Sequence, residues 1–185
     1  MKIKTSILAG ALSATLLGAT TAHAAPPVTD FAGDRVYLGA KFIVVDLDDI
    51  PPVSFDKAYN IGVYGGYHLL GQGAQIPKNL GGGTLSIEGE FTTTVVDGDT
   101  NFGGDWDITT ISAYAAYRFP LQGGVYLKGK AGGTWSDPDT PATRKSETDG
   151  SFGLGVGWHL GSGALEGEFT VISSELLFLS VGYLF

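Results

Sequence analysis

The sequence predicts an all-β fold, an eight-stranded antiparallel up-and-down transmembrane β-barrel with a plugged polar interior. Glycine makes up 29 of the 185 residues, about twice the usual share, which argues against a compact helical domain. No apolar run reaches the ~18 residues that a membrane-spanning helix needs. Eight segments alternate apolar and polar residues with a period of two, as strands with two different faces do.

Composition also excludes several classes of function. The chain has no cysteine, so it has no disulfide framework, no thiolate zinc site and no cysteine nucleophile. Its formal net charge is -8. An acidic chain is a poor partner for nucleic acid, because phosphate binding requires a basic face.

The first 24 residues predict a secretory signal peptide. Lys2 and Lys4 precede an apolar stretch from Ile7 to Leu17, and Ala22-His23-Ala24 matches the small-x-small pattern of a cleavage site. The apolar stretch is too short for a stable membrane anchor; the alternative is a buried N-terminal helix. We therefore assign residues 1–24 to the signal peptide and residues 25–185 to one outer-membrane barrel domain.

The first four predicted strands each carry one apolar face and one polar or small-residue face. In chain order their apolar faces are Val36, Leu38, Ala40, Phe42 and Val44, then Tyr59, Ile61, Val63, Tyr67 and Leu69, then Leu85, Ile87 and Phe91, and then Ile111, Ala113, Ala115, Tyr117 and Phe119. The opposite faces include Lys41, Glu88 and Arg118. A face of this kind is expected to point away from lipid.

The last four predicted strands repeat the pattern. Their apolar faces are Val125, Leu127, Ala131 and Trp135, then Phe152, Leu154, Val156 and Trp158, then Leu165, Phe169 and Val171, and finally Leu177, Leu179, Val181, Tyr183 and Phe185. The strand around Leu154 is opposed mainly by glycines, and the strand around Phe169 by glutamates.

Strand length and aromatic placement favour a membrane barrel over a soluble β-sandwich. Alternation alone also fits a sandwich, which would turn its apolar faces inward. The segments are roughly 10 to 12 residues long, which suits a tilted strand that crosses a bilayer. Aromatic residues gather near both ends of the apolar band, as in the two girdles of membrane barrels. An even number of strands closes the sheet without an exposed edge.

The two halves of the chain share short motifs in the same order. Val36-Tyr37-Leu38 is echoed by Val125-Tyr126-Leu127, Tyr67-His68-Leu69 by Trp158-His159-Leu160, and residues 88–92 by residues 166–170. Duplication of a four-stranded unit explains these echoes. Similar demands on both halves, without duplication, explain them equally well.

Eight charged residues are predicted to face the barrel interior and to form a lumen charge network. They are Lys41, Glu88, Glu90, Arg118, Lys128, Lys130, Glu166 and Glu168, four bases and four acids. Side chains fill an eight-stranded barrel, so these groups should pair, together with Tyr37, Tyr64, Tyr114 and Tyr126. A narrow polar path is the alternative, because Gly153, Gly155 and Gly157, and also Gly62 and Gly66, leave room for a water-filled crevice.

Acidic residues concentrate in the connections expected at one end of the barrel, which span residues 46–57, 96–107, 136–150 and 173–175. The connections at the other end, residues 71–83, 120–124 and 161–163, have few acids, and the first is long for a turn. Residues 97–101 resemble the start of an EF-hand loop, but Phe102 and Ile108 replace its glycine and glutamate. We expect no tight calcium site, and weak divalent binding by the loop acids stays an alternative.

The alternation, the neutral polar lumen and the last strand together resemble the small eight-stranded outer-membrane barrels of Gram-negative bacteria, the class that contains OmpX and the OmpA membrane domain. The most specific feature is the terminal strand, in which Leu177, Leu179, Val181, Tyr183 and Phe185 match the family's aromatic-ended assembly signal. The resemblance implies that the barrel-assembly machinery reads this signal. It also implies a location in the outer membrane, among lipopolysaccharide, for functions that reside in the loops.

The sequence offers little for catalysis. Lipid A deacylases of similar barrels are recognised by a His-x-Ser pair with a carboxylate, which His68 and His159 do not form. The Glu88/Glu90 and Glu166/Glu168 pairs lack the substrate cleft that paired catalytic carboxylates need. We expect a non-catalytic, monomeric barrel without cofactor, with a structural or surface-interaction role through its acidic loops. A narrow channel is the main alternative, and a lipid A-modifying enzyme is the third.

Overall fold

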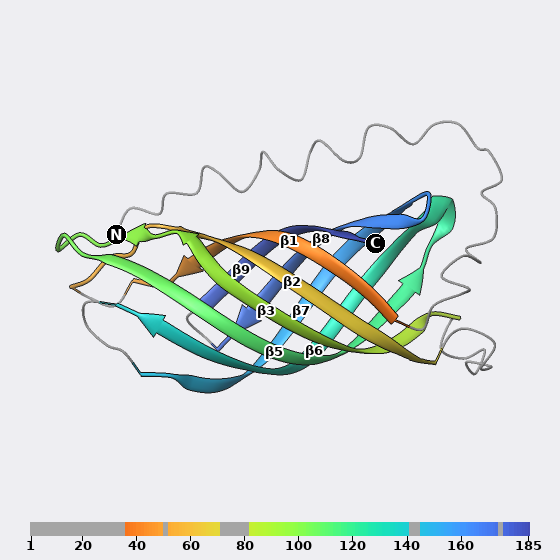
Figure 1. Cartoon of the computed structure of the whole chain (residues 1–185), viewed down its shortest axis with the longest axis horizontal. Helices are drawn as coiled ribbons and strands as arrows, with labels where there is room; N and C mark the ends of the chain where they lie inside the picture. The colour runs from red at the N-terminus through yellow and green to blue at the C-terminus, as the bar shows by residue number, and fades with distance from the viewer. Residues whose placement is uncertain (1–35, 50–51, 71–81, 141–144, 174–175) are drawn as a thin grey trace.

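The chain forms a closed antiparallel β-barrel (Figure 1). The structure is a computed structural model that describes residues 36–49, 52–70, 82–140, 145–173 and 176–185. The long strands are β1 (Val36–Leu47), β2 (Ala58–Leu70), β3 (Thr84–Val96), β5 (Asp105–Pro120), β6 (Val125–Asp139), β7 (Glu147–Leu160), β8 (Gly163–Ile172) and β9 (Leu176–Leu184). A two-residue strand, β4 (Gly98–Asp99), extends the sheet beside β5. The predicted signal peptide and most of the long 71–83 connection lie outside the described residues.

Two pairings close the circle. β9 pairs with β1 from Leu184 opposite Gly39 to Leu176 opposite Leu47. β3 pairs with β5 from Thr84 opposite Arg118 to Thr93 opposite Thr109. Each long strand therefore pairs with a strand on both sides. The hydrocarbon interior of a membrane requires this, because it offers no water to unpaired backbone N–H and C=O groups. The predicted eight-stranded up-and-down barrel is confirmed.

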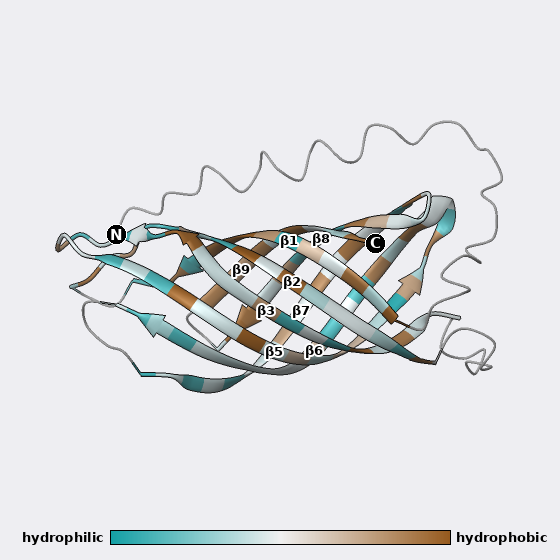
Figure 2. Ribbon diagram, viewed as in Figure 1, coloured by the Kyte–Doolittle hydropathy of each residue, from teal (hydrophilic) through white to brown (hydrophobic). Residues whose placement is uncertain are grey.

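The apolar faces point outward and the opposite faces point into the barrel. Leu38 is 64% exposed and Leu154 is 67% exposed, whereas the neighbouring Tyr37 is only 3% exposed. The hydropathy colouring shows brown, apolar residues recurring along the strands (Figure 2). An apolar exterior around a buried interior is the arrangement of a protein whose solvent is lipid.

The two ends of the barrel differ. At the turn end, η2 (Gln122–Gly124) links β5 to β6 through Gly123 and Gly124, whose φ angles are 76° and 77°. Gly161, with a φ of 66°, turns the chain from β7 to β8. These positive angles suit glycine because it has no Cβ. The loop end lies opposite, at the left of Figure 1, and holds the connections after β1, β3 and β6.

Three strands reach further into the loop end than the sequence predicts. β5 begins at Asp105, β6 continues to Asp139 and β7 begins at Glu147, although residues 105–107, 136–139 and 147–150 are assigned above to connections. The pairing explains the difference, since Asp107 lies opposite Asp139 and Ser136 lies opposite Glu147. Backbone pairing keeps these acidic residues in the sheet, where Asp105 and Glu147 are exposed and Asp107 and Asp139 are half-buried. Within the described ranges, no helix is long and apolar enough to span a bilayer.

Candidate functional site

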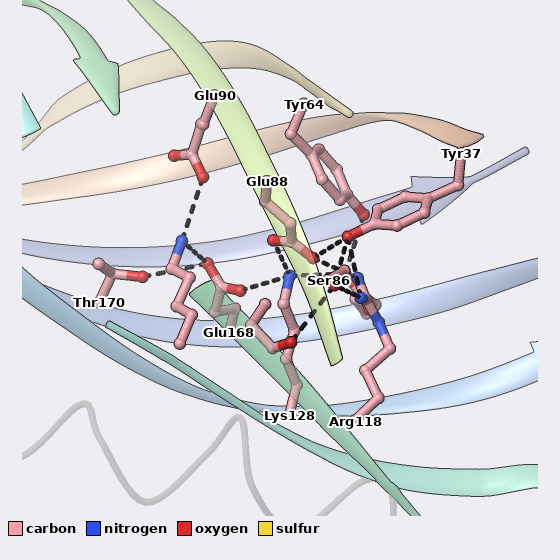
Figure 3. Close-up of polar contacts among 12 residues, drawn as sticks. Tyr37, Tyr64, Ser86, Glu88, Glu90, Arg118, Lys128, Glu168 and Thr170 are labelled. Atoms are coloured by element: carbon pink, nitrogen blue, oxygen red, sulfur yellow. Dashed lines mark hydrogen bonds and ion pairs between the residues drawn. The ribbon is translucent and has the colours of Figure 1, made fainter. Parts of the chain in front are cut away.

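The structure brings the eight predicted lumen residues together in one buried cluster. They come from β1, β3, β5, β6 and β8, and Figure 3 shows several of them converging. The side chains of Lys130 and Glu88 are 0% and 1% exposed, and the most exposed of the eight, Lys41, reaches only 7%. Buried charges of this kind require partners, because water no longer solvates them.

Two cations share two glutamates in the part of the network nearer the turn end. Arg118 Nη2 lies 2.6 Å from Glu88 Oε1, and its Nε lies 3.0 Å from Glu166 Oε1. Lys128 Nζ lies 2.9 Å from Glu88 Oε2 and 3.3 Å from Glu166 Oε2. Each carboxylate therefore faces two positive groups, which compensates for the loss of water.

A second set of four groups lies nearer the loop end. Lys41 Nζ lies 2.6 Å from Glu90 and 3.4 Å from Glu168, while Lys130 Nζ lies 3.1 Å from Glu90 and 2.5 Å from Glu168. Lys128 joins the two sets because it also lies 3.0 Å from Glu168. The eight groups thus form one continuous network.

Tyrosine rings fill the space beside the network. Tyr37 donates a hydrogen bond to Glu88 at 2.5 Å, and Tyr126 and Tyr64 donate to Glu166 at 2.6 and 3.0 Å. All three rings are buried. Their hydroxyls provide neutral donors to carboxylates, which strengthens a network from which water is largely excluded.

Glycines on the neighbouring strands make room for these rings. Gly66 lies opposite Tyr37, Gly39 opposite Tyr64 and Gly157 opposite Tyr126. A Cβ atom at Gly157 would clash with the ring of Tyr126. The predicted crevice beside the glycines is therefore occupied at these positions.

The other glycines named for the crevice also lie against neighbours. A Cβ atom at Gly153 would lie 2.8 Å from Lys130 Cε, one at Gly155 would lie 2.7 Å from the carbonyl oxygen of Gly167, and one at Gly62 would lie 3.1 Å from the carbonyl oxygen of Phe91. Glycine at these positions permits close packing of the neighbouring groups and does not leave a water-filled path through the barrel.

Residues that echo one another in the two chain halves occupy matching places in the network. The matching pairs are Tyr37 and Tyr126, Lys41 and Lys130, Glu88 and Glu166, and Glu90 and Glu168. β1 and β6 are four strands apart in the ring of eight, as are β3 and β8. The network therefore has an approximate two-fold arrangement, which is what duplication predicts.

A layer of hydroxyls follows toward the loop end. Thr92 and Thr110 lie 2.8 Å apart through their Oγ1 atoms, and Thr134 lies 2.9 Å from Ser112 and 2.8 Å from Ser151. All five side chains are buried. These side chains form an uncharged polar layer between the charged network and the loop end.

Beyond the hydroxyls, the interior becomes apolar, and sequence reasoning missed this layer. It consists of Ile43, Val45, Ala58, Trp106, Ile108, Ile172, Leu176 and Phe178, with Leu47 and Phe55 packed against it. Trp106 lies in a segment predicted to be a connection, but its side chain is buried, with 1% exposed. Ile43, Val45 and Phe178 lie on the lumen parity of their strands, and this was the signal that could have revealed the layer.

The connections at the loop end are tied to this apolar layer. Trp106 Nε1 donates to the carbonyl oxygen of Asp56 at 2.9 Å, and Asp56 N donates to Asp99 O at 2.8 Å. Asn101 donates through its amide to Pro52 O and accepts from Ser54 N, both at 3.0 Å. The segment that resembles an EF-hand start thus belongs to a β-turn platform made of residues 52–56 and 97–106.

His68 and His159 lie near the turn end of the interior. The ring of His68 lies 4.8 Å from that of Tyr37, and the ring of His159 lies 5.0 Å from that of Tyr126. Among the described residues, no group of three or more His, Asp or Glu side chains is arranged to hold a metal ion.

The predicted assembly-signal residues lie along the outer face of β9 and at its end. Leu179, Val181 and Tyr183 are exposed to the lipid side, and Leu177 is partly exposed. Phe185 is 71% exposed, and its backbone N donates to Leu38 O at 2.9 Å. The role of these five residues in assembly stays a prediction.

A closed barrel with an apolar outer band and a filled interior defines the class of small transmembrane β-barrels. The family model of the outer membrane protein beta-barrel domain matches residues 11–163. The chain therefore belongs to this family, and it is a protein of the bacterial outer membrane.

Solved structures support the same fold. Neisserial surface protein A (NspA) aligns with a TM-score of 0.55 and 16% identity, covering 82% of this chain and 96% of its own. OprG from Pseudomonas aeruginosa, an outer membrane protein, aligns with a TM-score of 0.54 and 11% identity, covering 81% and 95%. No curated protein matches the chain in sequence. At these identities the likeness concerns the fold alone.

Proposed function

We propose that this protein is a non-catalytic outer-membrane barrel that acts through its acidic loop end as a structural and surface-interaction protein. The observation that carries the proposal is the difference between the barrel interior and the loop end. A paired, buried interior supports a loop end that is acidic and that is tied to the barrel by hydrogen bonds over residues 52–56 and 97–106. We propose that the barrel is oriented in the outer membrane with its loop end facing the cell exterior.

The filled interior disfavours a channel. An ion would have to displace the pairs around Glu88 and Glu168 and then cross the apolar layer around Trp106 and Phe178. Neither step is favourable, because buried charges lose their partners in the first and an ion loses its hydration in the second. The narrow channel is therefore the second candidate.

The geometry of the carboxylates and of two histidines gives catalysis no support. The paired glutamates are already bound to cations inside the barrel, and His68 and His159 contact tyrosine rings. A lipid A-modifying enzyme would need a nucleophile, or an activated water, that faces the membrane.

Partners follow from location. Lipid and lipopolysaccharide surround the outer band, and the barrel-assembly machinery is the proposed reader of the β9 signal. Divalent cations binding weakly to the loop acids would reduce repulsion between those acids and anionic lipopolysaccharide. The barrel is proposed to be a monomer.

An acid-to-amide variant of the loop end tests the proposal. It changes Asp48, Asp49, Asp56, Asp97, Asp99 and Asp105 to Asn, which keeps an acceptor oxygen at Asp49 for the backbone N of Phe55. Full-length protein in phosphatidylcholine nanodiscs is incubated with cytochrome c, a small basic protein, at low salt and at about 0.5 M salt. We expect salt-sensitive binding to the wild type and its loss in the variant, with solute flux through proteoliposomes low for both. Equal binding to both proteins would contradict the proposal.

A further inference from the structure

Phe102 is an exposed aromatic residue outside the lipid band. It lies at the tip of the turn between β4 and β5, and its side chain is 68% exposed. Among the described residues, the other aromatic side chains with large exposure lie along the barrel strands or at the end of β9, where lipid covers them. Phe102 therefore faces water at the loop end.

The turn that carries Phe102 is held by a dense set of hydrogen bonds. Thr100 N donates to Gly104 O at 2.8 Å, Gly103 N donates to Thr100 O at 3.0 Å, and Gly104 N donates to Thr100 Oγ1 at 3.1 Å. Gly103 has a φ of 78°, an angle that glycine adopts without strain. The backbone beneath the Phe102 ring is thus fixed before any partner arrives.

The turn is also fixed to the barrel. Asn101 joins it to residues 52–54, and Gly98 packs under Trp106, where any Cβ atom would clash with the indole. Trp106 is itself buried in the apolar layer. An exposed ring on a rigid support loses little conformational freedom when it is buried in an interface, which is the condition that favours an anchoring residue.

The surroundings of Phe102 are acidic. Asp99 and Asp105 are direct cross-strand partners that flank the turn, and both are exposed, as are Asp97 and Asp56. Lys57 directly follows the platform segment 52–56 in the sequence, and it pairs with Asp46 at 3.3 Å. The aromatic ring therefore stands in a negative field.

We propose that Phe102 anchors a protein partner whose surface is basic and carries apolar side chains that pack against the ring. This inference rests on the proposed surface-interaction function and names its partner class. Carboxylates around an aromatic anchor favour lysine and arginine on the partner and speed its approach. A membrane is a poorer match, because the anionic surface of a lipid layer repels Asp99 and Asp105 as the ring approaches.

Two synthetic peptides provide the test. Both have eleven residues and six lysines that alternate with glycine, except that one carries tryptophan at two of the glycine positions and the other carries serine there. Binding to full-length protein in phosphatidylcholine nanodiscs is measured by titration, with empty nanodiscs subtracted. We expect the wild type to bind the tryptophan peptide about tenfold more tightly than the serine peptide, which corresponds to about 1.4 kcal/mol.

Phe102→Ser should reduce this preference to about twofold or less and leave binding of the serine peptide unchanged. Leu121→Ser is the matched control, because Leu121 is an exposed apolar residue at the opposite, turn end. It should keep the preference. Heat-dependent gel mobility reports that each variant is folded.

The outcomes separate this inference from the proposed function. An unchanged preference in Phe102→Ser overturns the anchor and leaves the acidic surface standing. Salt-sensitive binding that persists in the acid-to-amide variant overturns the proposed function itself. If Phe102→Ser instead reduces flotation of the nanodiscs with phosphatidylcholine and phosphatidylglycerol vesicles and leaves peptide binding unchanged, the ring contacts membranes and the protein-partner inference is wrong.

Discussion

The barrel interior contains two regions that are built in opposite ways. Near the turn end and in the middle, Arg118, Lys128 and their glutamates are held by charge pairing and by tyrosine hydroxyls. Near the loop end, Trp106 and Phe178 are held by apolar packing. The difference shows that a narrow membrane barrel can be filled by either chemistry, and that the apolar region also gives the loop platform a surface to pack on.

Reversing one charge in the network should have the largest effect. Lys130→Glu places a third carboxylate beside Glu90 and Glu168, which now lose a shared cation. Breaking a buried pair costs about 3–5 kcal/mol, and the added repulsion should raise the loss above that range. The urea unfolding midpoint in one detergent measures it.

Lys145→Glu is the control for this change. Among the described residues, Lys145 pairs with Glu147 at 3.0 Å, and its side chain is 77% exposed. A solvated loop charge should alter stability by less than about 0.5 kcal/mol. Equal midpoints for the two variants would show that Lys130 does not face a dry interior.

The apolar region should be almost as sensitive to loss of volume. Trp106→Ala removes a side chain that is 1% exposed and also the hydrogen bond to Asp56. We expect a loss of about 3 kcal/mol in the free energy of unfolding, together with protease sensitivity in residues 52–56. Trp135→Ala on the lipid face is the control, and a larger loss there would show that the apolar layer adds little.

Substitutions of glycine in the barrel strands should have smaller effects on stability. Gly157→Ala places a methyl group against the ring of Tyr126, so we expect a loss of about 1–3 kcal/mol. Gly167→Ala is matched to it, since an added Cβ there meets no atom within 4 Å. Thermal unfolding in the same lipid compares them, and equal melting temperatures would mean that the ring of Tyr126 moves aside freely.

Phe185, which directly follows β9, should matter least for stability and most for assembly into the outer membrane. Phe185→Ala removes an exposed ring that touches Tyr183, with centroids 5.3 Å apart. We expect the unfolding free energy to change by less than about 1 kcal/mol, while the amount assembled in the outer membrane falls and secretion continues. Pulse-labelled cells fractionated over time provide the measurement. Unchanged assembly would remove Phe185 from the signal.

The period-two pattern predicts the strands, their faces and which charged residues enter the interior, because each of these follows from parity along one strand. The individual ion pairs join different strands and depend on the register between them. Parity does not predict where a strand stops pairing. Asp107 and Asp137 have the composition of a loop, and only the neighbouring strand keeps them in the sheet. Likewise, the packing of Ile43 and Phe178 is not visible in the sequence, since the residues of their apolar layer come from strands that are far apart along the chain.

Recordings from refolded protein in a planar bilayer show whether ion pairing and apolar packing close the barrel interior. We expect no long-lived conductance, only rare small openings when an ion pair exchanges partners, because the charged network and the apolar layer block the path in series. Uniform, long-lived current steps that change size in Glu88→Gln or Lys128→Gln would contradict this expectation, and would make the channel the primary function.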